Sequence, residues 1–229
     1  MFFHGFQKLT LLDFPGRVAC TLFTGGCNFR CPFCHNALLV EGFAEGERIP
    51  AAEVVSYLDK RKGVLDGICV TGGEPLLSAG LADFFRAVRA RGFQIKLDTN
   101  GSFPDRLADL IAHGLVDYVA MDIKNCRDKY ALTAACSREE VDRVEKSIDL
   151  LLSGEVDYEF RTTVVHPLHT VEDIRAIAER IAGARRYFLQ DFRDSGHLLG
   201  EGMRSVGAET LAEMRDAAAT FVPSAALRG

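Results

Sequence analysis

The stretch GGCNFRCPFCHN, residues 25–36, holds three of the seven cysteines in the chain. Cys27, Cys31 and Cys34 are spaced C-x3-C-x2-C, so their thiols can converge on one metal centre. Soft thiolate ligands favour zinc, copper(I) or an iron–sulfur cluster. The spacing differs from a paired zinc ribbon, and no fourth cysteine follows as in a ferredoxin. Three protein ligands leave one position of the metal centre open, as in catalytic zinc sites.

A zinc site made of these three cysteines and His35 is the simplest alternative. It would make the chain a zinc-stabilised binding module, not an enzyme. Cys34 and His35 are adjacent in the sequence, and neighbouring side chains rarely point at one ion. The spacing therefore disfavours a tetrahedral zinc site with this ligand set.

The chain has 229 residues, of which 48% are hydrophobic and 26% are charged. This length and composition predict one ordinary globular domain, residues 1–229. The net charge of −5 gives no electrostatic support for binding nucleic acid. The N-terminus does not resemble a secretory signal, and no apolar run is long enough for a membrane span. We therefore expect a cytoplasmic protein with reduced cysteines and no membrane partner.

Short apolar runs alternate with helical periods along the chain, which is typical of βα units and a parallel sheet. Helices are expected after Pro50, after Ser78, from Pro104, after the capping-box pair Ser137 and Glu140, after Thr170, and around Leu211. Six strands are expected, at Val18–Thr24, Gly67–Thr71, Gln94–Thr99, Tyr118–Lys124, Tyr158–Val165 and Arg186–Asp191. Six such units fit either a partial barrel or a flat doubly wound sheet.

Polar motifs follow the predicted strands where the strands end. They are the cysteine stretch, GGEP at 72–75, DTNG at 98–101, DIK at 122–124 and QDF at 190–192. The fifth strand also carries Arg161 among apolar residues. Active sites of parallel α/β folds are built at this edge, so the pattern favours an enzyme of the barrel type.

The cysteine spacing, with the aromatic Phe33 directly before the third cysteine, resembles the signature of radical SAM enzymes. The resemblance implies an α/β fold with a partial (β/α)6 TIM-like barrel, which agrees with the six units. It also implies that Cys27, Cys31 and Cys34 hold one 4Fe–4S cluster. The open iron of that cluster would be chelated by S-adenosylmethionine (SAM).

A longer stretch, Gly5 to Val40, is similar to the start of the anaerobic ribonucleoside-triphosphate reductase activating proteins. These belong to the glycyl-radical-enzyme activases. The resemblance implies reductive cleavage of SAM to a 5′-deoxyadenosyl radical, which generates a glycyl radical on a partner enzyme. The implied partners are the anaerobic reductase and a flavodoxin or ferredoxin as electron donor.

The same resemblance assigns roles to the polar motifs. Gly72, Gly73 and Glu74 would bind SAM, with the Glu74 carboxylate on its ammonium group. By itself this motif could also be a plain turn. The other residues expected at the SAM site are Phe33, Asp98, Thr99, Asn100, Asp122, Lys124 and Arg161.

Two of these assignments have open alternatives. Asp98 and Asp122 could hold a monovalent cation beside the SAM carboxylate, as in some activases, or could cap turns or pair with Lys124. Arg161 could bind the SAM carboxylate or ribose, or could form a salt bridge to Asp122 or Glu159.

Residues outside these motifs are assigned structural roles. Cys20 and Cys69 are expected as small buried hydrophobic residues. Cys126 and Cys136 match no cluster spacing, so a second cluster is not expected. His166 and His169 could contact a substrate, but a solvated loop is the favoured expectation.

Other functions remain open at this point. The chain could act on another glycyl-radical enzyme, or on a small-molecule or peptide substrate. RNA modification is disfavoured by the acidic composition.

Overall fold

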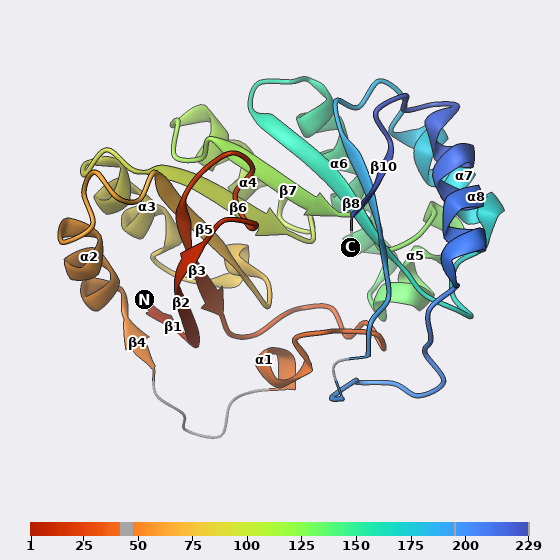
Figure 1. Cartoon of the computed structure of the whole chain (residues 1–229), viewed down its shortest axis with the longest axis horizontal. Coiled ribbons are helices and arrows are strands. Elements are labelled where there is room, and N and C mark those ends of the chain that lie inside the picture. The colour runs from red at the N-terminus through yellow and green to blue at the C-terminus, as the bar shows by residue number, and fades with distance from the viewer. Residues whose placement is uncertain (42–47, 195, 229) are drawn as a thin grey trace.

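An eight-stranded sheet forms the centre of the molecule (Figure 1). The computed structural model describes residues 1–41, 48–194 and 196–228. The sheet order is β10-β9-β8-β7-β6-β5-β3-β2, and all neighbours are parallel except β2 and β3. The strands are β2 (Gly5–Thr10), β3 (Ala19–Thr24), β5 (Gly67–Gly72), β6 (Gln94–Thr99), β7 (Tyr118–Asp122), β8 (Asp157–Val164), β9 (Tyr187–Asp191) and β10 (Ala226–Arg228). A separate antiparallel pair joins β1 (Phe2–Phe3) to β4 (Ile49–Pro50).

The sheet topology decides between the two predicted architectures. From β3 to β10 the strands lie side by side in their order along the chain, so the direction of winding never reverses. A doubly wound sheet needs such a reversal, whereas right-handed crossovers in one direction place all crossover helices on one face. The sheet curves with its helices outside (Figure 1), which confirms the partial TIM-like barrel.

All six predicted strands are present, with ends shifted by at most two residues. The two edge strands β2 and β10 were not predicted. β2 reads GFQKLT and is half exposed, and β10 has only three residues, so neither has a continuous apolar run.

The six predicted helices are also present. They are α2 (Ala51–Asp59), α3 (Leu81–Arg89), α4 (Pro104–Ala112), α6 (Arg138–Leu152), α7 (Val171–Arg180) and α8 (Ala208–Ala219). The capping box of Ser137 and Glu140 begins α6, as predicted. Three short helices were not predicted: α1 (Ala37–Glu41), the 3-10 helix η1 (Pro75–Leu77) and α5 (Arg127–Ala134). The sequence of α5, RDKYALTA, has no clear apolar repeat.

A large apolar core joins the strands to the helices, and a smaller cluster is formed by Phe14, Ala19, Tyr118 and Ala120. Cys20 on β3 is fully buried in this core, as predicted. The face of the sheet that carries Asp98 also carries two charged residues, Lys96 and Glu159, which are 2% and 0% exposed. Such groups need partners, so the inner face of the barrel is built around ion pairs as well as apolar contacts. Across the described residues, no helix is long and apolar enough to cross a membrane.

Candidate active site

The cysteine loop, residues 25–36, leaves the end of β3 and crosses the open end of the barrel toward α5 (Figure 1). Backbone hydrogen bonds fix it at its start and in its middle. Gly26 N–H donates to the Leu39 carbonyl at 2.8 Å, and Arg30 N–H donates to the Ala134 carbonyl at 3.0 Å. Phe29 and Phe33 are buried beneath the loop, so the loop is anchored by apolar packing as well.

The three predicted ligands, Cys27, Cys31 and Cys34, line one cavity of about 270 Å³. Within the described part of the chain, no group of three or more His, Cys, Asp or Glu side chains could hold a single metal ion. A 4Fe–4S cluster is held by soft thiolates that bind separate irons, so this donor set fits such a cluster.

The thiols lie in an environment that resists ionisation. Burial raises the pKa of Cys31 to about 12, although the ammonium of Lys124 lowers it. Burial also raises the pKa of Cys27. Because a metal ligand must be a thiolate, cluster binding has to release protons here, and the nearby positive charge favours that release.

Two glycines allow the loop after β5 to touch the cysteine loop. Gly72 has a φ of +112°, which favours glycine. A Cβ atom on Gly73 would lie 1.9 Å from the carbonyl oxygen of Gly26. Both glycines line the cavity, as expected for residues that let a ligand approach the backbone.

Glu74 follows these two glycines and is hydrogen-bonded to groups of η1 and of the end of β6. Its side chain is fully buried and does not line the cavity. One carboxylate oxygen accepts hydrogen bonds from Leu76 N–H (3.0 Å) and Thr99 Oγ1 (2.9 Å), and the other accepts from Asn100 N–H (2.7 Å). Glu74 therefore caps η1 and fastens the β5 loop to β6, and its contact with the SAM ammonium group stays a prediction.

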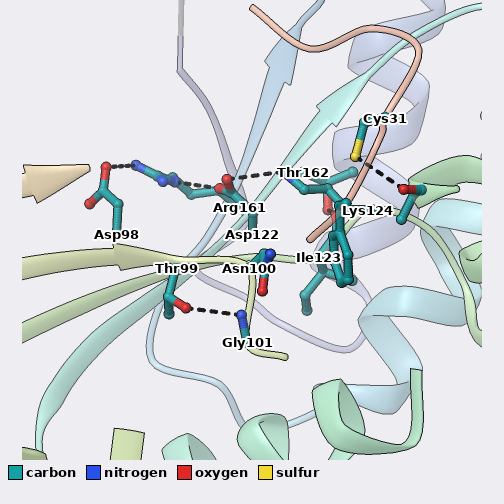
Figure 2. A network of polar contacts seen from close by, with 12 residues as sticks. Cys31, Asp98, Thr99, Asn100, Gly101, Asp122, Ile123, Lys124, Arg161 and Thr162 are labelled. Carbon is teal, nitrogen blue, oxygen red and sulfur yellow. Dashed lines mark hydrogen bonds and ion pairs between the residues drawn. The ribbon is translucent and has the colours of Figure 1, made fainter. Parts of the chain in front are cut away.

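The rim acids and Arg161 form one ion-pair network, shown in Figure 2. Arg161 lies opposite Asp122 in the pairing of β7 with β8. Its Nε is 2.9 Å from Asp122 Oδ1, and its Nη1 is 3.3 Å from Asp98 Oδ2. The salt bridge to Asp122 is thus present as one of the two alternatives, and that to Glu159 is not.

The second oxygen of each of these two carboxylates forms an ion pair with a lysine. Lys124 Nζ is 3.1 Å from Asp122 Oδ2, and Lys96 Nζ contacts Asp98 Oδ1. Burial alone would raise the pKa of Asp122, but Arg161 and Lys124 outweigh it and lower the pKa to about 2. Protein cations therefore occupy all four carboxylate oxygens, and a monovalent cation does not fit this arrangement.

Thr99 and Asn100 both line the cavity, but their side chains also organise its wall. The Asn100 amide donates to Asn28 Oδ1 at 3.0 Å and lies 3.8 Å from Cys27 Sγ. Asn28 in turn donates to Glu140 Oε1 at 2.8 Å. The end of β6 is thereby tied to the cysteine loop and to the start of α6.

His169 was expected in a solvated loop, and this expectation is wrong. The side chain is 4% exposed, its Nε2 lies 2.8 Å from the Lys124 carbonyl oxygen, and its ring packs edge-on against Phe33. His166 is hydrogen-bonded to Arg204 near the surface. Long-range contacts of this kind leave no signal in the local sequence.

The remaining cysteines do not reach the cavity. Cys126 begins α5 and hydrogen-bonds to Asp173, and Cys136 follows the same helix. Cys69 is fully buried, as predicted, but it also lies 3.7 Å from Lys96 Nζ. Lys96 itself was missed, although a lysine within the apolar run QIKLDT was a visible signal.

Comparison with known proteins places this site in context. The sequence model of the radical SAM superfamily matches residues 21–181. A protein of Methanocaldococcus jannaschii, provisionally named a glycyl-radical enzyme activating enzyme, is 34% identical over 192 residues, covering 82% of this chain and 78% of that protein. The pyruvate formate-lyase-activating enzyme of Clostridium pasteurianum is 30% identical over 130 residues, covering 55% of this chain and 53% of that enzyme.

The fold has counterparts among solved structures. Streptococcus suis SuiB bound to S-adenosylmethionine superposes with a TM-score of 0.70 at 12% identity. The match covers 91% of this chain and 52% of SuiB. At this identity the similarity concerns the fold alone.

Proposed function

Because the chain belongs to the radical SAM superfamily and is related to glycyl-radical enzyme activating enzymes, we propose that it generates a glycyl radical on a partner enzyme. The chain is an enzyme whose cofactors are a 4Fe–4S cluster and SAM. One observation carries the proposal: the three thiols of the cysteine loop share a cavity with Gly72, Gly73 and the charged rim.

Cys27, Cys31 and Cys34 would hold the cluster. After reduction by the electron donor, a bound cluster would supply the one-electron chemistry for reductive cleavage of SAM, which would lead to loss of a hydrogen atom from glycine. The chain contributes a loop in which Phe29, Cys31 and Phe33 are buried, which limits the access of water to the Cys31 sulfur atom. The ammonium of Lys124 favours the thiolate form of the ligands.

The rim would orient SAM. Gly72 and Gly73 leave backbone groups accessible on the cavity wall, because neither has a side chain to cover them. Arg161 and Lys124 provide positive charge for the SAM carboxylate on the same wall. Glu74 acts one step away, by holding Thr99 and Asn100 in place.

The substrate in this proposal is a peptide segment that contains glycine. Thr163 and Gln190 also line the cavity and offer uncharged hydrogen-bonding groups, which suit a peptide backbone. The similarity of Gly5–Val40 to reductase activating proteins makes anaerobic ribonucleoside-triphosphate reductase the first candidate partner. The electron donor would be a flavodoxin or ferredoxin.

The test is anaerobic incubation of the reconstituted enzyme with the reductase, SAM and reduced flavodoxin, followed by electron paramagnetic resonance. We expect a glycyl radical signal that disappears with Cys31→Ala and persists with the matched control Cys136→Ala. A parallel reaction contains pyruvate formate-lyase, because the C. pasteurianum relative is named as its activating enzyme. A signal only in that reaction would replace the proposed partner, and SAM cleavage with no signal in either would exclude both.

A further inference from the structure

We propose that protein cations, with the ammonium group of Lys96 on Asp98, take the place of a bound monovalent cation at Asp98 and Asp122. SAM binding by this enzyme would then not depend on sodium or potassium. The inference rests on the proposed function, because it concerns the SAM site of that enzyme. It starts from the disagreement between the cation site that the family resemblance implies and the contacts that these two carboxylates make.

Each carboxylate oxygen already has a cationic partner. Asp98 contacts Lys96 through Oδ1 and Arg161 through Oδ2. Asp122 contacts Arg161 through Oδ1 and Lys124 through Oδ2. A metal ion bound to either residue would have to displace one of these groups or approach it closely.

Lys96 is positioned to form an ion pair with Asp98. It lies two residues before Asp98 on β6, so both side chains point to the inner face of the barrel. Its side chain is 2% exposed and does not line the cavity, whereas Asp98 does, so Lys96 pairs with Asp98 without occupying the cavity. A buried ammonium requires a negative partner, and Asp98 provides it.

The other groups near Lys96 do not compete for it. Cys69 lies 3.7 Å from Nζ, and burial raises the pKa of its thiol, so it stays neutral. Glu159, on the same inner face, is held by Arg228 (2.9 Å) and by the Tyr118 hydroxyl (2.7 Å). The ammonium of Lys96 is therefore committed to Asp98.

The balance of charges points the same way. Two carboxylates face three protein cations, Lys96, Lys124 and Arg161, which leaves one positive charge beside the cavity. That charge is available to the carboxylate group of SAM. A further monovalent cation would add repulsion among like charges in a poorly solvated site.

The first test measures SAM binding to the cluster-loaded enzyme by equilibrium dialysis. The salts are potassium, sodium and tetramethylammonium chloride at equal ionic strength, since tetramethylammonium is too large for a site between two carboxylates. We expect dissociation constants that agree within about twofold. A tenfold or larger weakening in tetramethylammonium would overturn the proposal.

The second test removes the internal cation with Lys96→Met. This variant should bind SAM at least about fivefold more tightly in potassium than in tetramethylammonium. Its thermal unfolding midpoint should also rise in potassium, because an ion that binds the folded state stabilises it. The matched control is Lys129→Met, which removes a half-exposed lysine paired with Asp173 and should show neither effect.

A Lys96→Met variant that folds and stays indifferent to the cation would contradict the proposal. If the variant does not fold, the wild-type measurement still decides the matter. Failure of the activase function is separate, because it would remove the glycyl radical signal and leave these binding and unfolding measurements unaffected.

Discussion

Arg161→Met would test how much the ion-pair network stabilises the fold. The guanidinium is 14% exposed and bridges Asp122 and Asp98. Removal of one partner from a buried ion pair costs about 3–5 kcal/mol of unfolding free energy. Lys96 and Lys124 still contact one oxygen of each carboxylate. We therefore expect the lower end of that range, about 3 kcal/mol.

The unfolding free energy lost in Arg161→Met should be smaller at low pH than at neutral pH. Arg161 is the largest of the causes that lower the pKa of Asp122 from 3.8 to about 2. A lowered carboxyl pKa stabilises the fold above the ordinary pKa, and this stability is lost as pH falls toward 2. The shift corresponds to about 2 kcal/mol, and less after solvent screening, because Asp122 is 32% exposed. The difference between wild type and variant should thus be full at pH 7 and smaller near pH 3.

The assay is urea unfolding of the cluster-free, full-length protein at both pH values, followed by circular dichroism. Arg180→Met is the matched control, since Arg180 also pairs with two carboxylates, Glu145 and Asp149, but is 35% exposed. The control should lose at most about 1 kcal/mol. The reasoning is refuted if Arg161→Met loses no more than the control, or if its loss is the same at both pH values.

Three further substitutions test other parts of the site and its support. Gly73→Ala would place a Cβ atom 1.9 Å from the carbonyl oxygen of Gly26, which should displace the cysteine loop. We therefore expect this variant to bind less iron after reconstitution than the wild type. An iron content equal to that of the wild type would contradict this prediction. Burial raises the pKa of Glu74 from 4.5 to about 7, so the folded protein holds this proton more tightly and loses stability as pH rises through that range. Between pH 4.5 and 8, the unfolding free energy of the wild type should fall by about 3 kcal/mol relative to that of Glu74→Gln. If the unfolding free energies of the two proteins change in parallel with pH, the carboxylate is already ionised at pH 4.5 and the prediction is wrong. Ser137→Ala removes the side-chain acceptor for Glu140 N–H at the start of α6 and should cost about 1 kcal/mol by urea unfolding; an unchanged midpoint would show that solvent replaces this cap.

The sequence predicted those parts of the fold that local patterns determine. Strands buried on both faces have continuous apolar runs, and the α6 capping box places two residues at a fixed spacing. The order of the strands was not determined by these patterns. Only the pairing of β3 through β10 in chain order separates a partial barrel from a doubly wound sheet.

The site was predictable where the ligands are close in sequence, and less so where partners are distant. Cys27, Cys31 and Cys34 lie within one loop, and the structure places them on one cavity. Glu74 bonds to residues about 25 positions away on β6, so its direction could not be predicted from the motif GGEP. His169 reaches the Lys124 carbonyl across 45 positions in the same way.

Formation of 5′-deoxyadenosine tests the central claim most directly. The reconstituted protein is incubated anaerobically with SAM and a reductant, and the product is quantified by liquid chromatography. We predict product from the wild type and from Cys126→Ala, and none from Cys27→Ala, Cys31→Ala or Cys34→Ala. Equal product from the wild type and all three cysteine variants, or a wild-type protein that retains zinc and forms no product, would contradict the account.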